Sequence, residues 1–490
     1  KLMKQRFSGT SAVFLTFFTL LWLGSGAFIY YNVSVLNTYR TNKESIKIGV
    51  EFEKKYKKYE FLAQPKVTDL KINMDLYPEE RAARAYGKFV LVNKTNHPID
   101  SLMLEHGSDM TIEMLRIEGT DLQRVLEDKT NSIYFYLLPK TMQPGDTLLM
   151  EVQVDARYKG FPNNGLGRLM VYNGTFFDLR IFPSFGYSGD KINSDKERKK
   201  HGLPKKDYSA PPQNDPYGLS TLLFNNDADY VTFEATVSTS ADQLAVAPGY
   251  LEKEWEENGR KYYHYKMNSE MDLFANFSSA RYAVLRDVWK VDNNEEVNIE
   301  IFHHPTHTYN LDRFIKSVKA SLDYFSKNFS PYQYTQMRIL EFPRYASFAQ
   351  SFPNTVPYSE SFGWAADFSD PNKTDYVFYV TAHEVAHQWW GHQVTPSFTR
   401  GANQISESMA EYAALMVLDH EYGKDVMQNR LKYSLDRYLR GRSSESKFEE
   451  TLLNNDSRAY VWYDKGSLIL YALQDYIGEE NLNSGFKKFI

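Results

Sequence analysis

The sequence predicts an α+β protein in three parts, and three patterns carry this prediction. Residues 10–31 are apolar or small and carry no charge, as in a helix that crosses a membrane. Between about residue 70 and residue 302, apolar and polar residues alternate with a period of two, which is typical of half-buried strands. From Asn310 onward the apolar residues recur three and four apart, which indicates helices. We expect a transmembrane segment with its flanks (1–45), a β-rich domain (46–304) and a mainly helical domain (305–490).

The apolar segment is long enough to span a bilayer. At about 1.5 Å per helical residue, residues 10–31 cover the roughly 30 Å of hydrocarbon. A cleaved signal peptide has a shorter apolar core, whereas this stretch ends in aromatic residues that suit a membrane interface. We therefore expect a retained span that contacts lipid. Basic residues flank it on both sides, so charge leaves its orientation open.

The second part reads as many short strands. Leu70, Ile72, Met74 and Leu76 alternate with polar residues, and similar runs recur as far as Val297. Two exceptions are a charged stretch over 46–58, which predicts a helix, and a long polar stretch over 188–218, which predicts a surface excursion.

Composition excludes several classes of function. The formal charge of −5 gives no electrostatic basis for binding nucleic acid. The chain contains no cysteine, which rules out disulfides, thiolate metal ligands and cysteine nucleophiles.

The third part contains a motif with specific chemistry, His383-Glu384-x-x-His387, in a helical pattern that Thr374 or Asp375 can cap. Residues four apart lie on one face of a helix, so both imidazoles can bind one tetrahedral Zn²⁺. Glu384 can reach a water on that metal. A catalytic zinc needs a third protein ligand. The best candidate is Glu407, which begins a second helical pattern after a loop.

These motifs show a family resemblance. His383–Gly391, Ser406–Tyr412 and Tyr463–Gly466 read His-Glu-x-x-His-Gln-Trp-Trp-Gly, Ser-Glu-Ser-Met-Ala-Glu-Tyr and Tyr-x-Lys-Gly. In this order they resemble the aminopeptidase N type of zinc metallopeptidase. The resemblance implies a saddle-like β domain followed by a thermolysin-like catalytic domain. It also implies Zn²⁺ on His383, His387 and Glu407, and hydrolysis of a peptide substrate.

The roles of two residues follow from the same resemblance. Glu384 is expected to act as the base, and Tyr463 is expected to stabilise the oxyanion.

The chain also ends in a helical pattern, and we expect it to be a piece of a longer polypeptide.

The sequence departs from the family pattern in two places. The family usually has eighteen residues between the second His and the ligand Glu, whereas residues 388–406 make nineteen, which suggests a one-residue loop insertion and leaves Glu411 as a rival ligand. The family's substrate-binding Gly-x-Met-Glu-Asn falls on residues 350–354, with Pro353 in place of the amine-binding Glu. Asn354 and Glu360 are therefore the candidates for substrate binding.

A further group, His303, His304 and His307, has residue types that bind metal. Pro305 breaks any helical register among them, and we expect a surface loop.

The sequence thus predicts a membrane-anchored zinc peptidase with an extracytoplasmic catalytic domain. The alternative is a non-catalytic or weakly catalytic peptide-sensing domain attached to a membrane transporter. A membrane span and the missing amine-binding Glu also resemble bacterial fusions of an ABC transporter permease with an aminopeptidase-like domain, in which transporter subunits would be partners.

Overall fold

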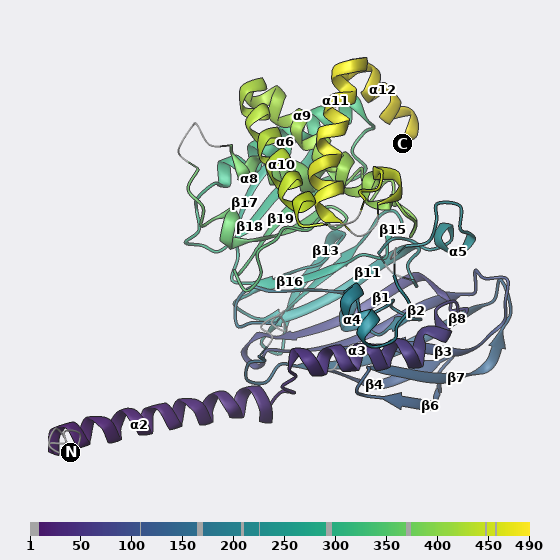
Figure 1. Cartoon of the computed structure of the whole chain (residues 1–490), viewed down its shortest axis with the longest axis vertical. Coiled ribbons are helices and arrows are strands. Elements are labelled where there is room, and N and C mark those ends of the chain that lie inside the picture. The colour runs from purple at the N-terminus through teal and green to yellow at the C-terminus, as the bar shows by residue number, and fades with distance from the viewer. Residues whose placement is uncertain are drawn as a thin grey trace.

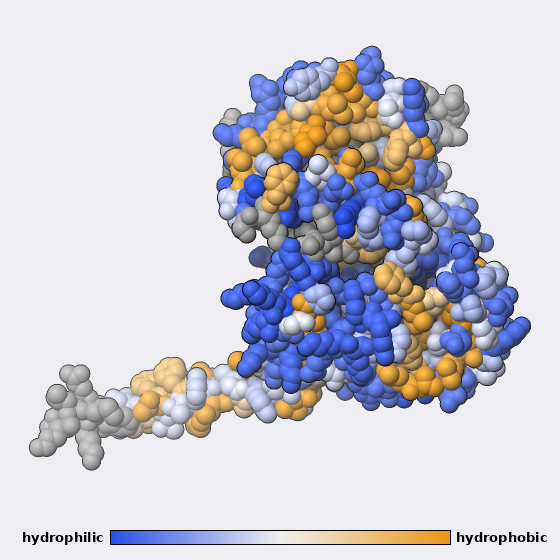
Figure 2. Space-filling model, turned by 45° about the vertical axis from the view of Figure 1, so that its right-hand side comes forward, coloured by the Kyte–Doolittle hydropathy of each residue, from blue (hydrophilic) through white to orange (hydrophobic). Residues whose placement is uncertain are grey.

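A long helix, α2 (Gly9–Tyr30), projects from the body of the protein (Figure 1). The computed structural model describes residues 9–107, 109–163, 170–206, 210–224, 226–290, 296–368, 374–445, 448–455 and 458–490. With the π-helical turn Tyr31–Val35, α2 forms a 27-residue apolar rod, the one helix in the described ranges that is long and apolar enough to cross a membrane. Its apolar side chains are exposed along the projecting arm (Figure 2).

A second helix, α3 (Asn42–Tyr56), lies along the β-rich domain and continues into a 3-10 turn, Lys57–Tyr59. Thr41 and Glu44 close its first turn as a capping box. Phe52 stacks on Tyr187 at 5.3 Å and Tyr56 is buried, so the helix predicted over 46–58 is present and docked.

The polar stretch 188–218 is not simply a surface excursion. It contains two short helices, α4 (Asp195–Lys200) and α5 (Pro216–Leu219). Arg198 of α4 makes a buried ion pair with Glu53 of α3 at 2.8 Å. The sequence could not show this, because the two residues lie far apart in the chain.

The β-rich domain is built mainly on a nine-stranded sheet, in which β15 (Met271–Asp272) pairs with β11 beside the main path. Along that path the strands are β13 (Tyr250–Glu257), β14 (Arg260–Lys266), β11 (Tyr230–Ser240), β1 (Lys66–Tyr77), β2 (Ala82–Val92), β8 (Thr147–Arg157), β4 (Met110–Ile117) and β5 (Thr120–Asp121). A 3-10 turn, Pro78–Glu80, joins β1 to β2. Leu70, Ile72, Met74 and Leu76 are all buried, so the predicted period of two is present.

Two smaller sheets complete this domain. One is β10 (Ser184–Phe185), β3 (Ile99–Glu105), β7 (Ile133–Met142) and β6 (Gln123–Asp128), and the other is β12 (Leu244–Val246), β16 (Asn276–Ala280) and β9 (Thr175–Asp178). A 3-10 turn, Leu179–Ile181, follows β9.

A separate four-stranded sheet begins the second lobe. Its order is β17 (Ala283–Lys290), β18 (Glu296–His303), β19 (Gln336–Phe342) and β20 (Thr355–Ser359). Strand β18 pairs in parallel with β19, and β19 in parallel with β20. The sequence placed β17 and β18 in the β-rich domain because a strand pattern does not reveal its partner. From this pairing we propose a domain boundary near residue 282, whereas the sequence pattern predicts one at 304.

Helix α6 (Leu311–Asn328) packs against this sheet and carries the predicted apolar stripe, with Phe314, Val318, Leu322 and Phe325 buried. Asn310 precedes it but does not cap it through its side chain. Asn310 has a left-handed φ of 60°, and its side-chain amide donates instead to the carbonyls of Gly363 and Ala366.

The remaining helices form the upper part of the lobe (Figure 1). They are α7 (Glu360–Gly363), α8 (Tyr376–Ala386), α9 (Met409–Tyr422), α10 (Lys424–Ser443), α11 (Gly466–Ile477) and α12 (Glu479–Phe489), with π-helical turns at Gln404–Ser408 and Val461–Lys465 and a 3-10 turn at Leu452–Asn454.

The docking of α3 can be tested at its buried ion pair. Removing one partner leaves the other charge buried and unpaired, which costs about 3 to 5 kcal/mol. We expect Glu53→Ala to speed amide hydrogen exchange across α3 and α4 in the detergent-solubilised full chain, followed by mass spectrometry.

The matched control is Lys47→Ala, which removes an exposed pair with Glu51 at 3.9 Å on the same helix. Such a pair contributes at most about 1 kcal/mol, so protection should change little. Equal protection in the two variants would mean that the Glu53–Arg198 pair does not hold α3 to the domain.

Candidate metal centre

Helix α8 carries the metal-binding motif through the centre of the lobe. Asp375 caps the helix by accepting the backbone N–H of Phe378 at 3.0 Å, and Arg313 makes an ion pair with the same carboxylate. The helix is apolar on nearly all sides and packs between α6 and α9, so His383 and Glu384 are held in a buried setting.

Three donor atoms converge at this helix. His383 Nε2 lies 3.1 Å from His387 Nε2, and Glu407 Oε2 lies 3.4 Å from the first and 3.5 Å from the second. Glu407 comes from the π-helical turn Gln404–Ser408, directly before α9. Such a turn takes one residue more than an α-helical turn, so it offers a place for the additional residue that the sequence assigned to the loop.

This triangle has the dimensions of a zinc site. Bonds of about 2.0–2.1 Å to a tetrahedral ion place neighbouring donors about 3.3–3.4 Å apart. Glu407 Oε2 is also buried and makes no hydrogen bond among the described residues, as expected of an atom reserved for a metal. Burial disfavours the charged form of Glu407, but His387 and His383 outweigh it and hold the pKa of the carboxyl well below its usual value.

The opposite side of each imidazole is also occupied. His387 Nδ1 lies 2.9 Å from the carbonyl oxygen of Trp390, which directs Nε2 toward the metal position. His383 Nδ1 lies 3.4 Å from Glu411 Oε1. Glu411 therefore stands behind the His383 ring and not at the metal position, because one turn of α9 carries it past Glu407.

Glu411 is fixed by its own partners. Its Oε2 accepts from the hydroxyl of Tyr379 and from Arg430 at 3.1 Å, and both Glu411 and Arg430 are buried. A carboxylate in this position orients the imidazole and raises its basicity. We infer a positioning role for Glu411, which sequence spacing alone left as a rival ligand.

Glu384 is aimed at a β-hairpin beside the metal centre. Burial raises the Glu384 pKa, against the opposing effects of the two imidazoles and of the backbone N–H of Ser351 in this hairpin. The hairpin is formed by bridges from Ala349 to Tyr358 and from Phe352 to Thr355.

Gln388 joins this hairpin to the turn that follows α8. Its side-chain nitrogen donates to Ser351 Oγ at 2.6 Å and to the Phe352 carbonyl at 3.0 Å, and its oxygen accepts the Asn354 N–H at 2.8 Å. The sequence motifs assign no role to Gln388. The available signal was a polar residue in an otherwise buried helical run, next to the second histidine.

Tyr463 lies on the other side of the centre, in the π-helical turn Val461–Lys465. Its ring centroid is 6.1 Å from that of His383, and its hydroxyl is close enough to Glu407 for this carboxylate to affect its pKa. Burial and this carboxylate raise the pKa of the phenol far above its usual value, so the hydroxyl keeps its proton and can donate.

The two expected substrate-binding residues lie elsewhere. Asn354 is fully buried, and its side-chain oxygen accepts from Arg338 at 3.0 Å and from Gln336 at 3.1 Å, which leaves no exposed surface for a ligand. Arg338 also donates to the carbonyls of Ala247 and Gly249, so this network joins the hairpin to the β-rich domain.

Glu360 lies past the far end of the hairpin. It follows Val356, the residue nearest Ser351 across the hairpin, by four positions, or about 13 Å along a strand. Its carboxylate accepts the Arg344 N–H at 2.9 Å and faces His307, so the structure separates it from the metal centre. His392 is buried, and its Nδ1 lies 3.1 Å from Oδ1 of the buried Asp272.

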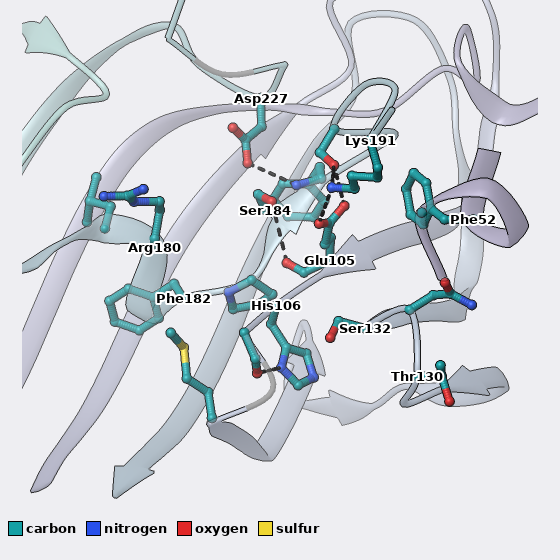
Figure 3. Close-up of a pocket in the computed structure, with 18 of the residues that line it drawn as sticks. Phe52, Glu105, His106, Thr130, Ser132, Arg180, Phe182, Ser184, Lys191 and Asp227 are labelled. Carbon is teal, nitrogen blue, oxygen red and sulfur yellow. Dashed lines mark hydrogen bonds and ion pairs between the residues drawn. The ribbon is translucent and has the colours of Figure 1, made fainter. Parts of the chain in front are cut away.

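A cavity of about 720 Å³ lies apart from this centre, in the β-rich domain beneath α3 (Figure 3). Phe52, Glu105, His106 and Phe182 line it, and Asp227 accepts the Phe185 N–H at 3.0 Å at its edge. None of the residues of the metal centre lines it, so the cavity is separate from the site at α8.

Comparison with known proteins agrees with this geometry. Residues 309–490 match the model of the Peptidase family M1 domain. The chain is 26% identical over 184 residues to "Probable aminopeptidase 1" of Sulfurisphaera tokodaii, which covers 36% of this chain and 23% of that protein. It is 23% identical over 325 residues to "Leucyl aminopeptidase" of Saccharolobus solfataricus, covering 60% and 39%. The chain thus spans less than half the length of these relatives.

Solved structures extend the similarity to most of the chain. An M1 zinc metallopeptidase from Deinococcus radiodurans has a TM-score of 0.58 at 16% identity, covering 87% of this chain and 85% of that one. Legionella pneumophila aminopeptidase A, in complex with aspartic acid, has a TM-score of 0.60 at 16% identity, covering 88% and 46%. The predicted fold class is confirmed, and the family resemblance agrees with the match over residues 309–490.

The ligand assignment can be tested by metal content. Glu407 Oε2 completes the donor triangle, whereas Glu411 acts through His383. We expect Glu407→Ala in the full chain to lose zinc from this centre, and Glu411→Ala to keep it with about 10- to 100-fold weaker affinity. Competition with a chromophoric chelator measures both affinities. The reverse order would make Glu411 the ligand.

Proposed function

We propose that this chain, whose residues 309–490 form a Peptidase family M1 domain, is a zinc-dependent peptidase of the aminopeptidase type. The observation that carries the proposal is the donor triangle of His383, His387 and Glu407, with edges of 3.1 to 3.5 Å. These distances fit a tetrahedral zinc ion. The relatives and solved structures of the same family are peptidases by name.

The proposed mechanism divides the work among named residues. A bound zinc ion would supply Lewis acidity and an activated water. Glu384 is buried beside the triangle and takes a proton from the attacking water, then delivers it to the leaving nitrogen. Tyr463, which keeps its proton, donates a hydrogen bond to the oxygen of the scissile carbonyl as negative charge develops there.

The hairpin 349–358 is the proposed support for the substrate backbone. Gln388, in the turn that follows α8, holds Ser351 and Phe352, so an extended peptide beside the hairpin would lie next to the metal centre. Pro353 stands in its turn, and no carboxylate is supplied from that position. We therefore propose a weakened requirement for a free N-terminus.

Membrane anchoring is a further part of the proposal. Helix α2 is apolar and exposed, and a short linker separates it from α3. The amide of Asn37 in this linker donates to the carbonyl of Lys159 at 2.9 Å, which holds the base of α2 to the β-rich domain. We propose that the peptidase lies close to a membrane surface on the extracytoplasmic side.

The role of Glu384 as a base predicts a separation of metal binding from turnover. We expect Glu384→Gln to keep its zinc and to lower kcat by about 100- to 10,000-fold, the usual contribution of a positioned base. Fluorogenic peptides measure kcat, and mass spectrometry of metal content measures zinc.

The matched control is Asp436→Asn, an exposed acid on α10, which should leave both quantities unchanged. Wild-type turnover in Glu384→Gln would remove Glu384 from the mechanism. A zinc-loaded wild type that cleaves no peptide would instead favour a peptide-sensing domain.

The missing carboxylate at Pro353 predicts tolerance of blocked substrates. Removing one partner of a buried charge pair costs about 2 to 5 kcal/mol of binding free energy. A site without the carboxylate makes no such pair with the substrate ammonium, so acetylation of the N-terminus should cost little. We expect kcat/KM for matched free and N-acetylated peptides to differ by less than about tenfold, or 1.4 kcal/mol.

Glu360→Gln should leave this ratio unchanged, because Glu360 lies away from the metal centre. A preference above about 100-fold for free N-termini would show that another carboxylate binds the ammonium. Loss of such a preference in Glu360→Gln would identify that carboxylate.

A further inference from the structure

A second group of metal-binding side chains gathers at one edge of the four-stranded sheet. Strands β18, β19 and β20 are parallel neighbours, so their carboxyl ends lie at the same edge. His307 lies in the loop after β18, Glu341 near the end of β19, and Glu360 directly after β20. The carboxyl edge of parallel strands is a common place for ligand sites.

The side chains of these residues converge. One ligand atom from each of the three lies within 4.8 Å of the others. His307 Nδ1 is hydrogen-bonded to Glu341 Oε1 and lies 3.9 Å from Glu360 Oε2. Because the three loops are separate in the chain, this convergence is a property of the sheet and not of a local motif.

Each carboxylate is oriented by a backbone group. Glu341 Oε2 accepts the His304 N–H at 2.6 Å, and Glu360 Oε1 accepts the Arg344 N–H at 2.9 Å. These bonds use one oxygen of each carboxylate and turn the other toward His307. Metal-ligating carboxylates are commonly held by outer hydrogen bonds of this kind.

The cluster is short of positive charge. Glu341 is only 4% exposed, and within the described ranges neither it nor Glu360 makes an ion pair with Lys or Arg. A protonated His307 supplies one positive charge against two carboxylates. A buried carboxylate without full compensation is costly, and a divalent cation would remove this deficit.

We propose that His307, Glu341 and Glu360 form a second metal site, which binds a divalent transition ion such as Zn²⁺ and ties the loop before α6 to the sheet. One imidazole with two carboxylates suits zinc better than calcium or magnesium, which prefer oxygen ligands alone. The sequence predicted only a surface loop here, because Glu341 and Glu360 are distant from the histidines in the chain. This site shares no residue with the centre at α8 and goes beyond the proposed function.

The number of zinc ions bound per chain tests this proposal. The full chain in detergent is stripped with a chelator, reloaded with Zn²⁺ and freed of excess ion, and its zinc is measured by mass spectrometry. We expect two zinc ions per chain in the wild type, one in His387→Ala, one in His307→Ala and none in the double variant. Because the two sites are removed separately, failure at α8 would not be confused with failure here.

A conservative variant covers the case in which His307→Ala does not fold. Glu360→Gln keeps the oxygen that accepts the Arg344 N–H but loses the anionic ligand, so we expect at least about 100-fold weaker binding of the second zinc, beyond the effect of an outer-shell change. The matched control is Glu300→Gln, on β18 and paired with Arg286, which should keep both ions. A wild type with a single zinc, unchanged in Glu360→Gln, would show that the cluster is an ion pair only.

Discussion

Two imidazoles and a carboxylate, held 3.1 to 3.5 Å apart inside the protein, are the constraint on which the second lobe depends. Buried polar groups at such distances are costly unless each is oriented and compensated. The structure meets this requirement with a buried α8, with Trp390 and Glu411 behind the two rings, and with Arg430 behind Glu411. The packing of α8 against α6 and α9 is therefore part of the metal centre, and not only of the core.

The turn that follows α8 also fixes the hairpin on which we propose that a peptide lies. Gln388 holds the hairpin at Ser351 and Phe352, and Asn354 is held from the other side by Arg338. Arg338 in turn bonds carbonyls of the β-rich domain at Ala247 and Gly249. The position of the hairpin, which we propose as the support for the substrate backbone, thus depends on how the two lobes meet.

At the edge of the four-stranded sheet, a second group of polar side chains is also held together by neighbouring groups, but it is less buried. Parallel pairing brings the ends of β18, β19 and β20 together, and the loops that follow them place His307 against Glu341 and Glu360. One sheet therefore supports both proposed metal sites, through the hairpin that contacts the candidate centre near Asn354 and through this cluster past Ser359. Away from both groups, the Glu53–Arg198 pair and the aromatic residues of α3 hold α3 to the β-rich domain.

The sequence by itself determined the features that depend on local geometry. The spacing of His383 and His387 along a helix, the length of the apolar segment and the alternation in β1 all follow from fixed rises and periods. Tertiary structure decided the rest, because it depends on contacts between distant residues. The π-helical turn and the packing of α9 set Glu407 at Nε2 of His383 and Glu411 at Nδ1. Sheet pairing places β17 and β18 in the second lobe and buries Asn354 against Arg338. It also places Glu360 beside His307, away from the metal centre. A periodic pattern specifies which face of an element is buried, but not which other element covers it.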